Sequence, residues 1–132
     1  MSVTMIDHIN IVAADLEETA GFYADLLDLE RRDPPFPSVA ATTQWMHDST
    51  GHPVIHISSL DAVRARGDDV AHGQTGSVHH VALACQGYDA VLSRLEARGL
   101  VKMTNTVEAI GLRQIFARDP NGVLLELNFR GD

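Results

Sequence analysis

Four side chains of this sequence, three histidines and one glutamate, could bind a divalent metal ion together. His8 and His80 each lie in a short β-rich run, and they are 72 positions apart. His56 and Glu126 lie in later apolar runs, 48 and 46 positions after those two histidines. Imidazole nitrogen and carboxylate oxygen are ligands that suit Fe(II), Mn(II), Ni(II), Co(II) and Zn(II). The near-equal spacing indicates two structural repeats, each carrying two candidate ligands.

In the strands that the sequence predicts, the four candidates also lie on the face opposite to the apolar side chains. Side chains alternate between the two faces of a strand, and the positions that alternate with the candidates are mostly Ile, Val, Leu and Phe. If the apolar faces lie beneath helices, the opposite faces form one concave surface lined with three imidazoles and a carboxylate. On that surface His8, His80 and Glu126 would form a 2-His-1-carboxylate metal site with open coordination positions.

Taken alone, each of these residues has a simpler interpretation. A single strand histidine is more often a surface or hydrogen-bonded core residue than a ligand. Glu126 could be a buried acid with an arginine partner such as Arg113. His47, His52 and His72 fall at strand ends or in loops, where we expect them to be solvated. Four more side chains could line a pocket wall: Trp45, Gln114, Phe116 and Leu124.

The elements that must position the candidates repeat in the same order. The first half predicts strands at 5–12, 29–33, 42–47 and 54–58, with a helix that begins after the N-cap Asp15. The second half predicts strands at 77–85, 101–105, 112–118 and 123–129, with a helix at 88–98. A turn that contains Asp and Gly precedes the last strand of each half. The predicted fold class is therefore α+β, with two tandem βαβββ modules.

The length of the chain fits one domain, which we expect to cover residues 1–132. Module one is predicted at 1–58, a linker at 59–76 and module two at 77–132. A unit of about 60 residues is marginally stable alone, so each module would gain from pairing with the other. The linker contains Asp68, Asp69 and several glycines, which predicts a solvated connector or a flap over a pocket, with a possible helical turn at 60–65.

Charge and cysteine content exclude several classes of partner. The net charge is −8 and the chain has only ten Lys and Arg residues, which argues against binding to nucleic acid or to an anionic membrane. The single cysteine, Cys85, cannot form an intramolecular disulfide. We find neither an apolar run of membrane-spanning length nor a secretory signal. The expected location is cytoplasmic, with no membrane partner.

The sequence resembles the vicinal oxygen chelate superfamily, also called the glyoxalase/bleomycin resistance protein/dioxygenase superfamily. Three motifs carry the resemblance, at residues 7–11, 79–83 and 116–127, and the last is the most specific. The resemblance implies that the paired modules curve into a half-barrel around one divalent metal ion. It also implies a homodimer, as is usual for small members, and a small substrate that binds through two adjacent oxygens.

The metal positions of the family carry over onto His8, His80 and Glu126. At the fourth position, where glyoxalase I enzymes typically have a carboxylate ligand, this sequence has His56. A histidine near the corresponding strand of extradiol dioxygenases acts as an acid or base beside Fe(II). The resemblance therefore implies that His56 is either a fourth ligand or an acid/base residue, and we expect His56 and Glu126 to be catalytic.

The subfamily stays open between three functions. The leading expectation is extradiol-dioxygenase-type chemistry, because histidine replaces a carboxylate at position 56, although Phe116 stands where extradiol enzymes often have tyrosine. The second is a glyoxalase-I-like lyase or isomerase that works through a metal-stabilised enediolate, although the sequence shows no clear set of basic residues that would bind glutathione. The third is a non-enzymatic antibiotic-binding protein like the bleomycin resistance proteins, which lack the metal ligands.

Overall fold

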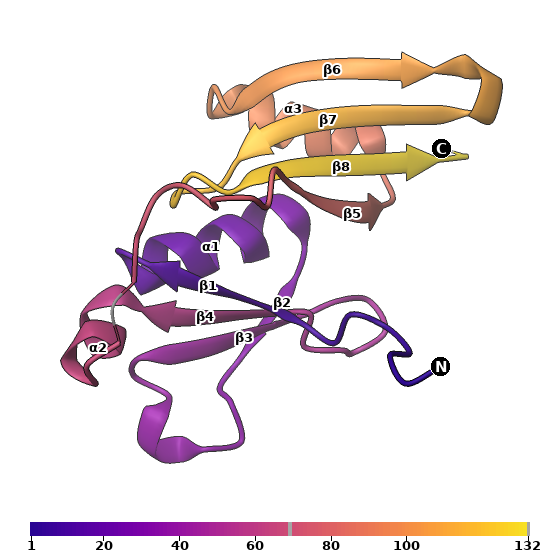
Figure 1. Cartoon of the computed structure of the whole chain (residues 1–132). Coiled ribbons are helices and arrows are strands. Elements are labelled where there is room, and N and C mark those ends of the chain that lie inside the picture. Colours follow the sequence, from indigo (N-terminus) through magenta and orange to yellow (C-terminus); the bar gives the residue numbers. More distant parts are fainter. Residues whose placement is uncertain (69, 132) are drawn as a thin grey trace. The chain divides into compact units, whose positions relative to one another are not determined.

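The computed structural model describes residues 1–68 and 70–131, which form two four-stranded sheets with helices (Figure 1). The chain divides into two compact units, residues 1–71 and 72–132. Each unit contains one sheet. Asp69 of the predicted linker and the C-terminal Asp132 lie outside the described residues.

Module one has the order β1 (Ile9–Ala13), α1 (Leu16–Leu27), β2 (Glu30–Arg32), η1 (Pro37–Val39), β3 (Thr43–His47) and β4 (Ile55–Ser59). Helix α2 (Leu60–Ala65) follows in the predicted linker. The strand order across the sheet is β1-β4-β3-β2. β1 runs parallel to β4, and the other pairs are antiparallel. α2 confirms the helical turn that the sequence predicted at 60–65.

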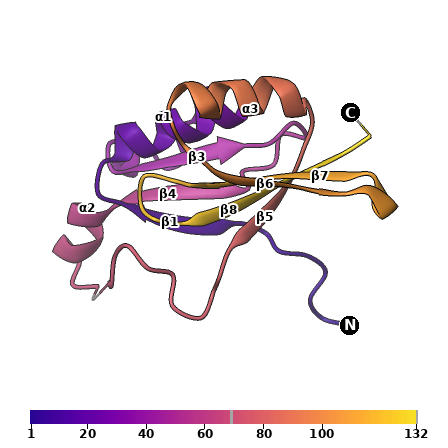
Figure 2. The same cartoon turned by 90° about the horizontal axis from the view of Figure 1, so that it is seen from above.

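Helix α1 begins where the sequence predicted, because Asp15 satisfies a backbone donor of the first turn. Its carboxylate accepts a hydrogen bond from the Glu18 backbone N–H at 3.0 Å. The helix packs on β3 and β4 (Figure 2), where Tyr23 and Leu26 meet an apolar sheet face that includes Ile57. That packing leaves the other face of the sheet to the polar residues.

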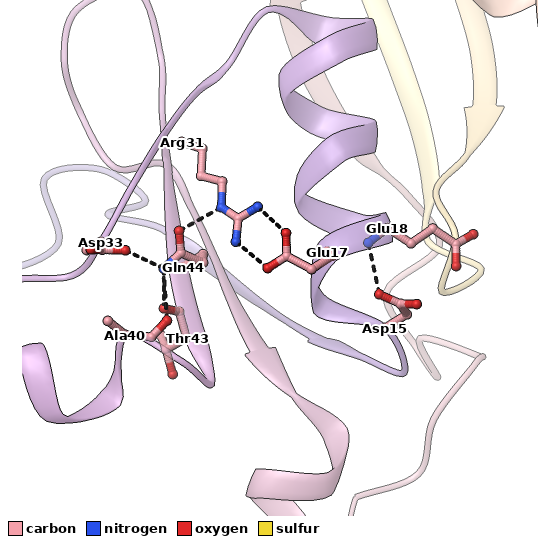
Figure 3. Close-up of polar contacts among 8 residues, drawn as sticks. All are labelled: Asp15, Glu17, Glu18, Arg31, Asp33, Ala40, Thr43 and Gln44. Carbon is pink, nitrogen blue, oxygen red and sulfur yellow. Dashed lines mark hydrogen bonds and ion pairs between the residues drawn. The ribbon is translucent and has the colours of Figure 1, made fainter.

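A polar cluster at one side of module one ties α1 to the sheet (Figure 3). The Arg31 guanidinium donates to both carboxylate oxygens of Glu17, at 2.6 and 2.7 Å, and its Nε donates to the side-chain oxygen of Gln44 at 2.7 Å. The Gln44 amide in turn donates to Asp33 at 2.8 Å. The Arg31 contact lowers the pKa of Glu17 below its ordinary value, so the carboxylate remains ionised at neutral pH.

Module two repeats the arrangement, with β5 (Val81–Cys85), α3 (Tyr88–Ala97), β6 (Val101–Val107), η2 (Glu108–Ile110), β7 (Leu112–Arg118) and β8 (Leu124–Arg130). The strand order is β5-β8-β7-β6, and only the β5–β8 pair is parallel. Helix α3 packs on one face of this sheet through Val91 and Leu95, which are both buried (Figure 2). The two βαβββ modules confirm the predicted fold class.

The strands predicted to contain His8 and His80 begin later than the sequence predicted. The first ladder pair in module one is Ile9 with Ile55, and the first in module two is Val81 with Leu125. His8 and His80 therefore lie immediately before β1 and β5, not within those strands. The β-rich composition extends further than the ladder, because a strand is defined by its partners and not by its own propensity.

The turns before β4 and β8 have the same construction, as the repeat predicted. The Gly51 and Gly122 N–H groups donate to the backbone carbonyls of Asp48 and Asp119, at 2.9 and 3.1 Å, and both glycines have positive φ. The two aspartate carboxylates each accept further backbone N–H groups of the turn. A hydrogen bond from Thr50 lowers the pKa of Asp48.

Candidate functional site

The first pair of candidates, His8 and His56, forms a ring stack on the polar face of module one. Their ring centroids are 3.7 Å apart with an interplanar angle of 14°. Trp45 is the cross-strand partner of His56 and stacks on it at 4.2 Å and 9°. Because β4 lies between β1 and β3, the His56 ring lies between the other two. Packing between flat rings fixes the position of His56 and excludes water from both of its faces.

One ring nitrogen of His56 is buried and lacks a partner. Its Nε2 atom makes no hydrogen bond to any part of the chain that the structure describes. A neutral imidazole has one N–H and one nitrogen lone pair, so Nε2 can present a lone pair to a cation when the ring proton is on Nδ1. Burial lowers the pKa of His56, with a further contribution from His8, so the ring is neutral at neutral pH.

His8 has the hydrogen bond that commonly orients a metal-binding imidazole. Its Nδ1 lies 2.6 Å from a carboxylate oxygen of Asp7, and this hydrogen bond lowers the pKa of Asp7. The His52 ring also donates to the backbone carbonyl of Asp7. A carboxylate on Nδ1 fixes the tautomer with a lone pair on Nε2, as in carboxylate–histidine–metal arrangements.

The second pair, His80 and Glu126, lies in module two. His80 Nε2 is 3.9 Å from Glu126 Oε1, which is too long for a hydrogen bond but places both atoms on one side of the sheet. The other ring nitrogen of His80, Nδ1, is 2.9 Å from His79 Nδ1. Glu126 Oε2 accepts a hydrogen bond from the Asn128 amide at 3.0 Å. Each candidate ligand thus presents one atom that the local hydrogen bonds leave available.

The two pairs occupy equivalent positions of the repeat. In module one His8 lies two residues before Asn10, and Asn10 is the parallel partner of His56. In module two His80 lies two residues before the parallel partner of Glu126, which is Ala82. The antiparallel partners correspond as well, since Trp45 faces His56 and Phe116 faces Glu126. The registers therefore confirm the internal repeat that the sequence predicted.

The family model of the Glyoxalase/Bleomycin resistance protein/Dioxygenase superfamily matches residues 5–127. The chain belongs to this superfamily. This finding confirms the resemblance that the three sequence motifs carried.

Solved structures show the same fold in other members. The fosfomycin resistance protein FosX from Listeria monocytogenes has a TM-score of 0.68 and 19% identity, over 98% of this chain and 95% of that chain. A glyoxalase/dioxygenase from Nostoc punctiforme has a TM-score of 0.73 and 12% identity, over 99% and 94%. A glyoxylase/bleomycin resistance protein/dioxygenase domain from Frankia sp. EAN1pec has 0.70 and 17%, over 99% and 95%. At such identities the likeness shows the fold alone, and comparison with curated protein sequences gave no match.

The ligand types of each pair suit a divalent cation. Members of the superfamily generally use divalent metal ions, and imidazole nitrogen and carboxylate oxygen are ligands that suit first-row metals. The buried, unpartnered Nε2 of His56 is the local observation that calls for such a partner, because a buried polar atom without one is costly. Within residues 1–68 and 70–131 the candidates form two pairs, one in each module, and no three metal-binding side chains form a group.

One expectation about the other histidines was wrong. His47 was predicted as solvated, because strand ends are usually exposed, but it is buried, with 8% of its surface exposed. Its Nδ1 has no partner among the described residues. His52 and His72 are half-buried, and their rings donate to the Asp7 backbone carbonyl and, at 3.0 Å, to the side-chain oxygen of Asn121.

The structure also adds residues whose roles the sequence did not reveal. Asn105, Gln114 and Asn128 form a hydrogen-bonded chain that ends on Glu126. The sequence marked Gln114 only as a possible pocket residue. The positions alternate correctly in their strands, but their pairing depends on the register of β6, β7 and β8. No helix within the described parts of the chain is long and apolar enough to cross a membrane.

Proposed function

We propose that this superfamily member is a divalent-metal-dependent enzyme that acts on a small substrate chelated through two adjacent oxygens. The observation that supports this most directly is His56, a neutral imidazole held between two rings with a buried and unpartnered Nε2. An imidazole kept neutral in this way is prepared to bind a cation or to accept a proton.

His8, His80 and Glu126 would hold the metal, and His56 would be a fourth ligand or an acid/base residue. The candidate ions are Fe(II), Mn(II), Ni(II), Co(II) and Zn(II), because all accept imidazole and carboxylate ligands. When bound, such an ion supplies Lewis-acid polarisation and a template for two substrate oxygens. The His8–Asp7 hydrogen bond keeps the ligand tautomer that this role requires.

Extradiol-dioxygenase-type chemistry is the leading reaction. His56 would take the proton of a substrate hydroxyl at Nε2 and return it later, which its lowered pKa permits at neutral pH. Trp45 and the exposed Phe36, whose ring centroids are 6.3 Å apart, form an aromatic surface beside His56. Such a surface favours a flat aromatic substrate, as ring cleavage requires.

A glyoxalase-I-like lyase or isomerase is the second candidate. Glu126 favours it, because Asn128 binds only Oε2 of that carboxylate. Oε1 could move a proton from a substrate carbon, in the manner of a general base. The third candidate is a metal-free antibiotic-binding protein that holds its ligand against Trp45 and Phe36. In all three cases we expect a homodimer, since superfamily members often form dimers.

Metal identity and oxygen uptake test these assignments. Protein purified anaerobically would be analysed for metals, then loaded with each candidate ion and assayed on catechols. Activity with Fe(II) accompanied by oxygen consumption supports the dioxygenase, and activity with Ni(II), Co(II) or Zn(II) on a carbonyl substrate without oxygen uptake supports the lyase. A His80→Ala variant that keeps full affinity for a small ligand, with no metal in either protein, would contradict the enzymatic proposal.

The role of His56 can be separated from that of the other candidates by one substitution. If His56 is a ligand, His56→Ala lowers metal affinity. If it is an acid/base residue, the variant keeps its metal but turnover falls by about 10²–10⁴-fold, the usual contribution of general acid–base catalysis. His72→Ala is the control, because His72 belongs to neither pair.

A further inference from the structure

A chain of side-chain amides crosses three strands of module two and ends on the Glu126 carboxylate. Asn105 Nδ2 donates to Gln114 Oε1 at 2.9 Å, and Gln114 Nε2 donates to Asn128 Oδ1 at 3.0 Å. Asn128 Nδ2 then donates to Glu126 Oε2 at 3.0 Å. Asn105, Gln114 and Asn128 are directly opposite one another in the ladders. The strand register therefore places these three amides side by side.

The carboxylate determines the direction of every hydrogen bond in this chain. An ionised carboxylate only accepts, so Asn128 must present its NH₂ group to Glu126. The carbonyl oxygen of Asn128 then faces Gln114, so Gln114 must donate its NH₂ group to Asn128. The carbonyl oxygen of Gln114 in turn accepts from the NH₂ group of Asn105. The oriented amides all donate toward the negative charge, and hydrogen bonds to a charged acceptor are the stronger kind. Gln114 is 9% exposed, so water does not easily replace its two bonds.

Within its described residues, module one has no equivalent chain. The positions that correspond to Glu126 and Asn128 are His56 and Ser58, and there Asn10 donates to the Ser58 hydroxyl at 3.1 Å. The Asn10–Ser58 hydrogen bond joins β1 and β4, whereas the amide chain joins β6, β7 and β8. His56 instead depends on ring stacking with His8 and Trp45. The amide chain is thus associated with the only carboxylate among the four candidates.

We infer that Asn128 is a positioning residue for Glu126, and that Gln114 holds Asn128 in place. The Asn128 amide occupies Oε2, so Oε1, the atom nearest to His80, is presented to a divalent cation. The inference rests on the proposed function, because it assigns the orientation of a proposed ligand. Hydrogen bonds behind a ligand reduce the freedom it loses on binding, and their removal commonly weakens metal affinity about 10–100-fold.

Metal affinity of the intact chain, measured by competition with a chelator and Co(II) as the probe, tests the inference. We expect about a tenfold or greater loss for Asn128→Ala, a smaller loss for Gln114→Met, and the smallest for Asn105→Ala at the exposed end. Asn128→Leu preserves the side-chain volume without the donor and should match the alanine variant. Urea unfolding of each variant confirms that it folds.

A double-mutant cycle separates positioning from a general structural effect. In the Glu126→Ala background, Asn128→Ala should cause no further loss of Co(II) affinity, since it then has no ligand to orient. Ser58→Ala, the matched substitution in module one, should leave the affinity within about twofold. Equal losses from Asn128→Ala in both backgrounds would overturn the inference, as would full affinity in Asn128→Ala.

The metal-free protein supplies a second readout. Slow hydrogen exchange of the Asn128 side-chain amide by NMR should become fast in Glu126→Ala, and rapid exchange in the unaltered protein would overturn the inference. A protein that keeps this slow exchange but does not bind Co(II), or any other candidate ion, would contradict the proposed function. The two failures are therefore distinguishable.

Discussion

At the scale of single residues, the same ligand type is supported in two different ways. His8 is oriented by a carboxylate, and His56 is oriented by two flat rings. The carboxylate on His8 Nδ1 keeps a lone pair on Nε2 of that ring, and the stack holds His56 with an Nε2 that has no partner among the described residues. The sequence pointed to these histidines through strand alternation, but the orientation of the rings depends on contacts that only the folded module makes.

Trp45 gives a direct optical test at this scale, because it is the only tryptophan of the chain. Its ring lies 4.2 Å from that of His56, so a paramagnetic ion at His56 Nε2 would be within contact-quenching range. We expect Co(II) or Ni(II) to quench most of the tryptophan emission. The measurement is a fluorescence titration of metal-free protein.

The control for this titration is His72→Ala, which should be quenched like the unaltered protein. His56→Ala should lose most of the quenching if His56 is a ligand. Undiminished quenching in His56→Ala would show that the ion binds elsewhere.

At the scale of elements, the two hairpin turns show how a repeat can diverge in its surroundings. Gly51 and Gly122 have nearly equal φ values, +85° and +84°. A Cβ atom on Gly51 would meet nothing within 4 Å, whereas one on Gly122 would lie 2.4 Å from the Gly73 carbonyl oxygen. The segment that leads into β5 therefore crosses directly over the second turn, and His72 secures it by bonding to Asn121.

This difference predicts unequal costs for the same substitution. Gly51→Ala should destabilise the protein by about 1–2 kcal/mol, the cost of a left-handed conformation for a residue with Cβ. Gly122→Ala should cost about 1–3 kcal/mol more, because the backbone at Gly73 must also move. Urea unfolding at equilibrium measures both, and each substitution serves as the control for the other. Equal costs would mean that the close approach at Gly122 relaxes freely.

At the scale of the whole molecule, each compact unit contains one pair of candidate ligands. Two protein ligands bind a first-row ion weakly, and most catalytic sites use three. If both pairs serve one ion, the chain binds one divalent ion and not two. We expect isothermal titration to give one ion per chain, and a His8→Ala/His56→Ala variant to lose tight binding although its second pair is intact.

Mixing complementary variants then shows whether one chain or two chains supply the ligands. The His8→Ala/His56→Ala variant and a His80→Ala/Glu126→Ala variant would be mixed, unfolded and refolded together. If each site takes one module from each chain of a dimer, random assortment restores about a quarter of the sites. If each chain completes its own site, the mixture binds no more metal than its components. Two ions per chain in the unaltered protein would contradict the single-ion prediction itself.

The sequence by itself determined the α+β class, the two βαβββ modules and the four candidate ligands. Those features follow from local rules, since alternation, capping and turn residues act within a few positions of one another. The strand starts were less accurate, and His8 and His80 lie just outside their strands because ladders need partners.

Only the tertiary structure decided how each ligand is oriented. The stack of Trp45 on His56 and the amide chain of Asn105, Gln114 and Asn128 join residues of neighbouring strands that lie opposite one another in a ladder. Which residues face each other is set by register, and register depends on the packing of a whole sheet against its helix. A hydrogen-bond direction or a buried lone pair becomes defined only when that packing is complete.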